Sequence, residues 1–294
     1  MTDSIRSIAA WAADVDDAWC VKQQIYRPAD EGLWEVLLTL ANGYYGCRAN
    51  LELPAAGREP GVYLAGVYDK PDVPADGDAF GLSVQNKAVT PAYAVAPQWN
   101  LVELEVDGVG VDFMNADLVR FERTLDMRRG LLLSTYELVD ERGRTTRLRL
   151  LSAALLTETS VFAMVCEVEA VDYDGEVVVR FCCEQPDTPQ YIARLKDYVS
   201  HTDYLGHTVA GDGVMVRGRV AQTGTELALA SCTRPRQDAA GRVVQQERGV
   251  AEEFCFHAER GQAYAFDRVC AVCHSEADDA PADRAQQQVA AVAA

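Results

Sequence analysis

Hydrophobic and polar residues alternate with a period of two along most of the chain after residue 95. In the stretch NLVELEVDGVGVDF, Val102, Leu104 and Val106 would share one face of a strand, and glutamates would share the other. Asp107-Gly108 follows directly, and this pair favours a tight hairpin turn because both residues tolerate positive φ. The pattern predicts a β-hairpin with one apolar face turned toward a core.

The same alternation returns in further segments, separated by short turns rich in glycine and aspartate. The segments are STYEL, TRLRL, SVFAMVCEVEAV, EVVVRFCC, VMVRGRV, ELALASC, EFCFHA and AYAFDRVCAVC. The turns between them hold residues 140–144, Asp174-Gly175, Asp212-Gly213, Thr223-Gly224 and Arg260-Gly261. Strands at this spacing, joined by tight turns, are typical of antiparallel sheets packed as a sandwich. We therefore predict an all-β fold of two packed antiparallel layers.

Helical patterns are scarce, and two segments carry them. TPQYIARLKDYV, residues 188–199, predicts one short helix because its tyrosines and leucine recur at helical spacing. Residues 279–294 are rich in alanine and glutamine, with Pro281 near their start, and predict a second helix. An Ala-rich helix of about sixteen residues is marginal in water. We therefore expect this tail to fray or to dock on another chain.

Charge and composition exclude several classes of protein. The formal net charge of −18 would repel DNA or RNA, so nucleic-acid binding is disfavoured. The sequence holds no run of about 18 uncharged apolar residues, so we expect no membrane span. The N-terminus lacks a basic start followed by an apolar run, which predicts no secretory signal and a cytoplasmic location. The nine cysteines are an odd number and are expected to be free, mostly buried thiols.

One motif has the spacing of covalent haem attachment. Cys270-Ala-Val-Cys273-His274 has the form C-x-x-C-H. It lies in an alternating segment, which would direct the two cysteines to opposite faces of a strand. A zinc site needs about four well-placed ligands, and no second close pair of Cys or His accompanies this one. We interpret these residues as structural strand residues, and we predict no metal and no cofactor.

Patterns of enzyme chemistry give no catalytic residue. The sequence contains no G-x-S-x-G, no G-x-G-x-x-G and no G-x-x-x-x-G-K-[ST]. Glycoside hydrolysis uses two carboxylates at a set separation. With 45 Asp and Glu residues, pairs such as Glu122 and Asp126 are abundant, and no pair stands out from solvated strand faces.

Aromatic residues gather in one third of the chain. They are Tyr44, Tyr45, Tyr63, Tyr68 and Trp99. Their apolar, polarizable faces could stack on sugar rings. Core packing is the alternative explanation, and the sequence leaves both open.

LANGYYGCRANLEL, residues 40–53, opens an ordered series of motifs. The others are GVYLAGVYDK, APQWNLVELEVDG, FERTLDMRRGLLLSTYEL, VAQTGTELALAS and AFDRVCAVCHS. The series resembles the N-terminal part of glycoside hydrolase family 65, which includes maltose, trehalose, kojibiose and nigerose phosphorylases. Its first member is similar to the family's N-G-Y-x-G-x-R-G-x-x-E pattern, and the resemblance covers about residues 15–275. Arg48-Ala49 and Gln98-Trp99 depart from the family's R-G and N-W.

The resemblance implies an architecture and a reaction. It implies a galactose-mutarotase-like β-supersandwich over residues 1–275 and the start of a helical linker over residues 276–294. In the family an (α/α)6 barrel follows and carries the catalytic glutamate and the phosphate site. The expected reaction is inverting phosphorolysis of an α-glucoside, with inorganic phosphate as co-substrate. The chain would then hold no catalytic residue, and we expect it to end inside the linker.

Site residues and partners follow from the same resemblance. We expect Gly43 and Gly46 to let the backbone turn tightly, with Arg48 anchoring the turn to a carboxylate or a carbonyl. Asn42, Tyr44 and Arg48 are the candidates for substrate contact where sandwich meets barrel. The barrel, a disaccharide and a second copy in a homodimer are the expected partners. A free-standing carbohydrate-binding or assembly module is the alternative, and a small enzyme with a new site on the sandwich ranks last.

Overall fold

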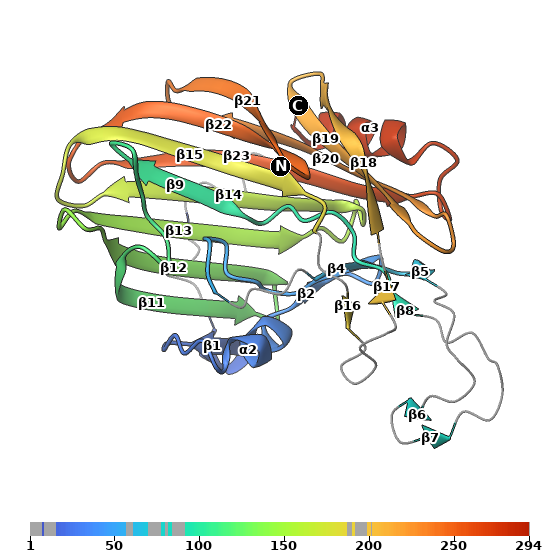
Figure 1. Cartoon of the computed structure of the whole chain (residues 1–294). Helices are drawn as coiled ribbons and strands as arrows, with labels where there is room; N and C mark the ends of the chain where they lie inside the picture. Colours follow the sequence, from blue (N-terminus) through green and yellow to red (C-terminus); the bar gives the residue numbers. More distant parts are fainter. Residues whose placement is uncertain are drawn as a thin grey trace.

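The computed structural model describes residue 8 and residues 16–56, 61–69, 78–79, 82–83, 92–186, 190–191, 199–200 and 202–293. Within these residues β-strands dominate, and every strand pair is antiparallel (Figure 1). Two large sheets face each other, and smaller sheets lie at one end. The predicted all-β sandwich is therefore confirmed.

Nine strands form the larger sheet. In spatial order they are β1 (Cys20–Gln23), β11 (Asp117–Asp126), β12 (Leu131–Val139), β13 (Thr145–Ala154), β14 (Val161–Ala170), β23 (Ala263–His274), β20 (Glu226–Pro235), β19 (Gly213–Val220) and β18 (Thr202–Ala210). The predicted turns at residues 140–144 and at Thr223-Gly224 are present, and Gly143 and Gly224 both have positive φ. Local hairpins thus build most of this sheet.

Five strands form the smaller sheet. In spatial order they are β10 (Val109–Gly110), β9 (Val102–Val106), β15 (Gly175–Glu184), β22 (Gly249–Ala258) and β21 (Ala240–Gln246). Asp107 and Gly108 connect β9 to β10 with φ of 47° and 76°. Positive φ at both central residues belongs to the predicted two-residue hairpin turn.

The chain changes sheets at two of the predicted turns. Asp174-Gly175 lies between β14 and β15, and Arg260-Gly261 lies between β22 and β23. In each case the two strands belong to different sheets, so these turns are crossovers and not hairpins. Alternation shows which residues of a strand face inward and not which strand lies alongside, so it did not distinguish these crossovers from hairpins.

The main core lies between the two sheets. Val102, Leu104 and Val106 are buried there, as their alternation predicts. Phe181 of β15 packs against Phe266 of β23, with ring centroids 5.4 Å apart. Apolar side chains from both inner faces therefore hold the layers together.

A buried polar network also joins the layers. Arg268 of β23 is almost fully buried and donates to the carbonyls of Trp99, at 2.6 Å, and Cys182, at 3.0 Å. Its Nε lies 3.1 Å from Ser231 Oγ, which donates to the buried carboxylate of Glu252 at 2.8 Å. Each buried charge therefore has hydrogen-bond partners, as burial demands.

Short strands form four small sheets. They are β2 (Leu40–Ala41), β3 (Tyr45–Cys47) and β4 (Val62–Leu64); β5 (Tyr68–Asp69) with β8 (Ala92–Tyr93); β6 (Asp78–Ala79) with β7 (Leu82–Ser83); and β16 (Gln190–Tyr191) with β17 (Val199–Ser200). The helix predicted over residues 188–199 is wrong where β16 and β17 pair, because a short apolar run fits both periods. Residues 192–198 lie outside the described residues.

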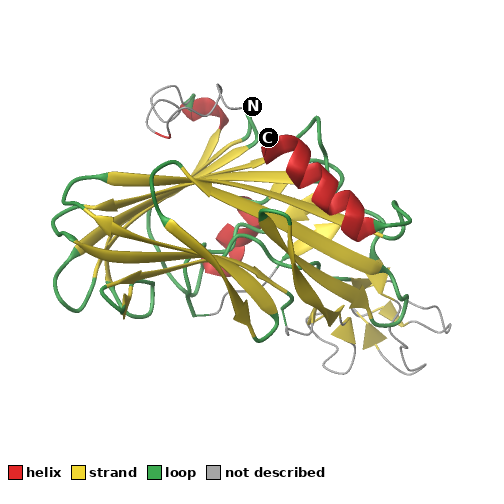
Figure 2. Cartoon of the chain, turned by 90° about the horizontal axis from the view of Figure 1, so that it is seen from above, coloured by secondary structure: helices red, strands yellow, loops and turns green. Residues whose placement is uncertain are grey.

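Among the described residues, the named helical segments are η1 (Asp17–Trp19), α2 (Glu31–Leu37) and α3 (Pro281–Ala293). The predicted C-terminal helix is confirmed as α3, which lies against the outer side of the larger sheet (Figure 2). Ala285 and Val289 pack on Ala228 and Ala230 of β20. The expectation that this tail frays or docks on another chain is wrong, because its apolar stripe is buried on its own sheet.

Candidate functional site

The segment 42–53 carries the motif residues, and it begins with a turn held by Asn42. The Nδ2 atom of Asn42 donates to the carbonyls of Leu155, at 2.7 Å, and Thr159, at 2.8 Å. Its Oδ1 atom accepts from the backbone N–H groups of the two residues after Gly43, at 3.1 and 3.2 Å. Gly43 has a φ of 90°, a value that favours glycine. The Asn42 amide thus fastens the turn to the connection between β13 and β14.

Gly46 has a different place from the one expected. It lies in β3, between Ala41 of β2 and Tyr63 of β4, and its φ is not positive. The expected tight turn is confirmed at Gly43 and wrong at Gly46, because the second glycine lies in a three-stranded sheet.

Tyr44 points into the chain and stacks on His274 at the end of β23. The two ring centroids are 5.5 Å apart, with planes inclined by 25°. Among the described residues, neither the Tyr44 hydroxyl nor the two His274 ring nitrogens have a hydrogen-bond partner. Burial raises the pKa of Tyr44. Burial lowers the pKa of His274, although Asp278 and Glu276 oppose that shift.

Arg48 is anchored to helix α2. Its Nη2 atom lies 2.8 Å from Glu35 Oε2 and 3.4 Å from the carbonyl of Gly32. Its aliphatic stem fills the space beside Gly61, where a Cβ atom would overlap it. The predicted anchoring to a carboxylate and a carbonyl is confirmed, and both groups belong to α2.

Arg48 belongs to a buried charge cluster. We use this name for the buried residues Glu31, Glu35, Glu52 and Arg123 together with the half-buried Arg48. Arg123 Nη1 lies 2.6 Å from Glu31 Oε1, and its Nη2 atom donates to the carbonyl of Ala49. Burial alone would lower the pKa of Arg123, but Tyr136, Glu52 and Glu31 outweigh burial and raise it. The cluster therefore keeps its arginine charged.

Glu52 completes this cluster from the core side. Its carboxylate accepts from Ser134 Oγ at 2.8 Å and from Tyr136 Oη at 2.6 Å. Burial, followed by the charge of Glu52, raises the pKa of Tyr136 well above its usual range. Glu52 is thus a hydrogen-bonded core carboxylate.

The other carboxylates considered from the sequence serve separate contacts. Glu122 lies 3.5 Å from Arg120 on the surface of β11. Asp126 is buried and accepts from the backbone N–H groups of Arg128, at 3.0 Å, and Arg129, at 3.1 Å. These contacts hold strand faces and a turn.

The C-x-x-C-H motif lies in β23 with its cysteines on opposite faces. Cys270 is buried between the two sheets, and Cys273 is buried under α3. The nine cysteines, all of which the structure describes, are free, and seven of them are buried. Among the described residues, no three His, Cys, Asp or Glu side chains are grouped to hold a metal ion.

Three tyrosines form an exposed cluster at one end of the sandwich. Tyr93 is 64% exposed and lies 5.8 Å from Tyr63 and 5.6 Å from Tyr68, centroid to centroid. Trp99, by contrast, is buried. Sequence reasoning missed Tyr93, because it joins the cluster only through the pairing of β8 with β5.

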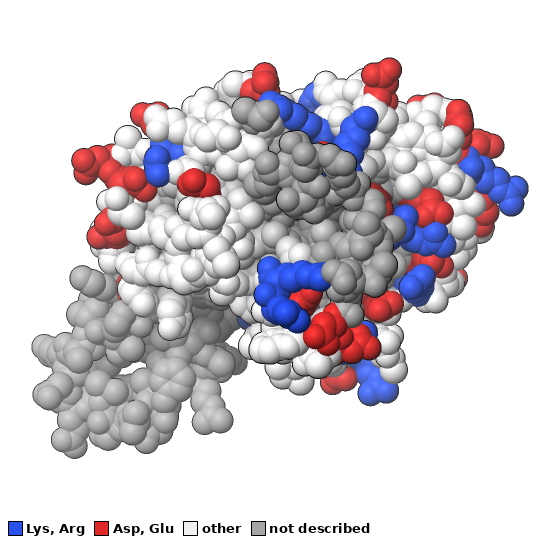
Figure 3. Space-filling view, turned by 180° about the vertical axis from the view of Figure 1, so that it is seen from behind, with Lys and Arg blue, Asp and Glu red and all other residues white. Residues whose placement is uncertain are grey.

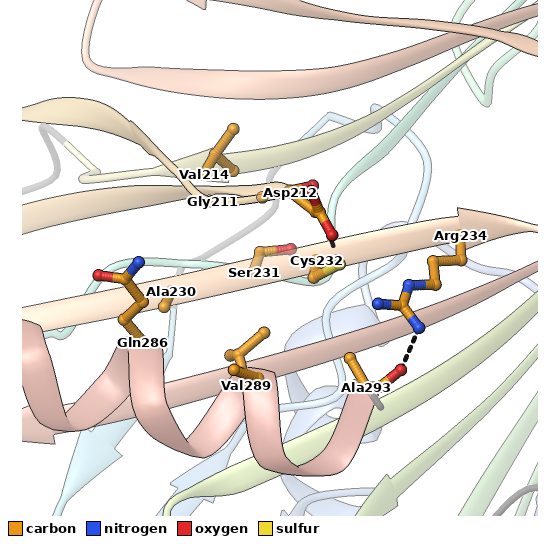
Figure 4. A pocket seen from close by; sticks show the side chains of 12 residues that line it. Gly211, Asp212, Val214, Ala230, Ser231, Cys232, Arg234, Gln286, Val289 and Ala293 are labelled. Atoms are coloured by element: carbon orange, nitrogen blue, oxygen red, sulfur yellow. Dashed lines mark hydrogen bonds between the residues drawn. The ribbon is translucent and has the colours of Figure 1, made fainter.

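A cleft of about 240 Å³ lies where α3 meets β20 and the turn between β18 and β19 (Figure 4). Its walls are mostly small: Ala230 and Cys232 come from β20, and Val289 comes from α3. Arg234 reaches across the cleft to the carbonyl of Ala293. The cleft is a seam between helix and sheet.

Charge is mixed on the face seen from behind (Figure 3). Acidic and basic side chains stand in small groups there, with uncharged surface between them. The net charge of −18 therefore does not gather into a patch of one sign on the described part of this face. Among the described helices, none has the length and apolar character needed to cross a membrane.

Comparison with known proteins finds one family over almost the whole chain. The family model described as "Glycosyl hydrolase family 65, N-terminal domain" matches residues 21–294. Kojibiose phosphorylase of Thermoanaerobacter brockii is 30% identical over 165 residues, which are 55% of this chain and 19% of that protein. An uncharacterized glycosyl hydrolase of Mycobacterium tuberculosis is 25% identical over 272 residues, 89% of this chain and 20% of that protein. The chain thus spans about a fifth of the length of these relatives.

A solved structure among those that match shares the fold. A human-microbiome protein assigned as a kojibiose phosphorylase superposes with a TM-score of 0.77 and 15% sequence identity. The match covers 94% of this chain and 35% of that one. At this identity the likeness shows a common fold.

Proposed function

The chain belongs to the N-terminal domain of glycosyl hydrolase family 65, and from this premise we propose that it is a non-catalytic β-sandwich that works beside a helical catalytic barrel. In this proposal residues 1–275 are the sandwich, and residues 276–294 begin the linker to the barrel. The parent enzyme would transfer a glucosyl group from an α-glucoside to phosphate. The family match over residues 21–294 carries the proposal.

The contacts of the acidic residues support a non-catalytic role. A general acid must reach the glycosidic oxygen of a bound substrate. Glu52 is instead enclosed by Ser134 and Tyr136, and Asp126 caps a turn. Each carboxylate already has a structural contact, so neither is poised toward a ligand.

The proposed reaction requires no catalytic residue on the sandwich domain. In inverting phosphorolysis an acid protonates the leaving oxygen, and phosphate attacks the anomeric carbon from the opposite face. Phosphate replaces the base-activated water of an inverting hydrolase, so one protein carboxylate suffices. That carboxylate and the phosphate site would belong to the barrel. On the sandwich side, the segment 42–53 would face the barrel. Its conformation would be held by the contacts of Asn42, Tyr44 and Arg48.

The test compares this chain with the full gene product, by which we mean everything its reading frame encodes. Each is incubated with maltose, trehalose, kojibiose or nigerose, with and without phosphate, and glucose 1-phosphate is followed. We expect none from the chain alone and phosphate-dependent release from the full gene product. If the folded chain alone releases glucose 1-phosphate, and Asp126→Ala abolishes this release, then the active site lies on the sandwich and the proposal is wrong.

A second candidate function rests on the tyrosine cluster. Tyr68 and Tyr93 are 39% and 64% exposed, and aromatic rings of this kind can stack on sugar rings. As a carbohydrate-binding module, the chain would bind a glucose disaccharide here. Titration calorimetry with maltose, trehalose and kojibiose tests this, with Tyr93→Ala expected to weaken binding about tenfold. Leu156→Ala, at an exposed position outside the cluster, is the control.

A further inference from the structure

Helix α2 has its polar and apolar faces reversed. Glu31 and Glu35 point inward and are buried, 6% and 1% exposed. Leu33, Val36 and Leu37 share the opposite face and are 61%, 56% and 47% exposed. A surface helix ordinarily turns its apolar stripe to the core.

The buried charge cluster explains the inward face. Glu31 lies 2.6 Å from Arg123 of β11, and Glu35 lies 2.8 Å from Arg48. The backbone N–H of Ala49 also donates to the Glu35 carbonyl at 2.9 Å. These contacts fix the rotation of α2 about its axis. Ion pairing explains why the glutamates are buried, but it gives no reason for three apolar residues on the outside.

A partner that covers the outer face would supply that reason. Contiguous exposed apolar surface commonly marks an interaction site. Figure 1 shows α2 beside β1, at the edge of the larger sheet. Trp19 and Met127 are exposed at the end of this edge, and the Met127 N–H donates to the Trp19 carbonyl at 3.0 Å. Exposed apolar side chains therefore also occur at the Cys20 end of this edge strand.

The size and charge of this surface favour a partner within the same polypeptide. Stable complexes of separate proteins bury about 800 Å² on each partner, which exceeds what three helix side chains offer. Two copies, each with a net charge of −18, would also repel each other. A linked domain needs less surface because the linkage gives a high effective concentration. The chain spans about a fifth of its relatives, so they carry ample additional polypeptide.

We propose that the outer face of α2, formed by Leu33, Val36 and Leu37, is the surface on which the catalytic barrel of the parent enzyme packs. The inference rests on the proposed function and names its contact. Arg48 of the motif segment 42–53 acts here as a positioning residue, because it holds Glu35 and thereby sets the direction of the apolar face.

Hydroxyl-radical footprinting read by mass spectrometry tests the contact. The chain alone and the full gene product are oxidised in parallel, with exposed Leu156 and buried Leu38 as references. In the chain alone, Leu33 and Leu37 should react like Leu156. In the full gene product the reactivity of Leu33 and Leu37 should fall to the level of Leu38. Phosphorolysis is assayed separately, and its result alone decides the proposed function.

Three results would overturn the proposal. The first is that Leu33 and Leu37 react equally in the chain alone and in the full gene product, which includes the case of a reading frame that encodes nothing more. The second is protection in the chain alone that grows with concentration, because it assigns the face to a second copy. The third concerns the double variant Leu33→Gln/Leu37→Gln, with Leu156→Gln as control. We expect the double variant to abolish cooperative unfolding of the full gene product and to leave the Tm of the chain alone unchanged. Unchanged cooperativity contradicts the contact.

Discussion

Helices α2 and α3 lie on the same molecule and meet it in opposite ways. Helix α3 buries Ala285 and Val289 and exposes polar side chains, as an amphipathic helix on a sheet ordinarily does. Helix α2 buries Glu31 and Glu35 and exposes leucines. The difference lies in the surface beneath each helix: alanines of β20 under α3, and Arg123 of β11 under α2.

The comparison shows that the receiving surface decides which side of a helix is buried. It also gives the two helices different weaknesses. Apolar packing weakens gradually as groups are removed. A buried ion pair is damaged strongly when one partner is lost, because the other charge stays buried without compensation. We call the region around α2 and Arg123 the α2 corner, and the region around α3 and β20 the α3 corner. A single substitution should therefore lower the free energy of unfolding more at the α2 corner than at the α3 corner.

The largest effect should follow from removing the cation of the α2 corner. Arg123→Met leaves Glu31 and Glu52 buried without their arginine, and we expect the free energy of unfolding to fall by about 3–5 kcal/mol. Urea denaturation measures it. Arg142→Met, at an exposed position, should change stability by less than about 0.5 kcal/mol. A loss at Arg123 no larger than that of the control would remove the contrast between the corners.

Packing at the α3 corner should give the next largest effect. Val289→Ala removes two buried methyl groups from the contact with β20, and we expect a loss of about 2 kcal/mol. The same denaturation experiment measures it, with Gln287→Ala on the exposed side of α3 as control. If Val289→Ala costs more than Arg123→Met, the ranking of the two corners is reversed.

Acid should act on the end of β23 through His274, which stacks on Tyr44. Burial lowers the pKa of this side chain in the folded state, so the unfolded chain binds the proton first as the pH falls. Stability present at neutral pH is therefore lost as the pH falls through the ordinary histidine pKa of about 6.5. Denaturation curves at several pH values should show this dependence in the wild type and in His257→Gln, an exposed control. They should show a flatter profile in His274→Gln, and an unchanged profile there would contradict the assignment.

The smallest effect should come from the outer face of α2. Leu33 and Leu37 touch water in the chain alone, so Leu33→Gln/Leu37→Gln should alter its free energy of unfolding by less than about 0.5 kcal/mol for each residue. Thermal unfolding of the chain alone measures this. A large loss would mean that these leucines already pack within the chain.

Sequence reasoning found the elements whose signal is local. Strands such as β12 and β13 follow alternation, and α3 follows from its alanine- and glutamine-rich composition and Pro281. Helix α2 was missed because its orientation depends on Arg123, 92 residues after Glu31. The tyrosine cluster was missed in part because Tyr93 joins it through strand pairing. The neighbour of a strand is likewise set by distant segments, so alternation did not show that β14 and β15 lie in different sheets.

The central position of β23 has a consequence for synthesis on the ribosome. This strand pairs with β14 on one side and β20 on the other, and only α3 follows it among the named elements. Until residues 263–274 have emerged, β14 and β20 have no partner at their facing edges. Unpaired edges of this kind invite pairing with other chains. The larger sheet therefore cannot close before residues 263–274 have emerged, and until then its two parts carry facing edges that are open to pairing with other chains.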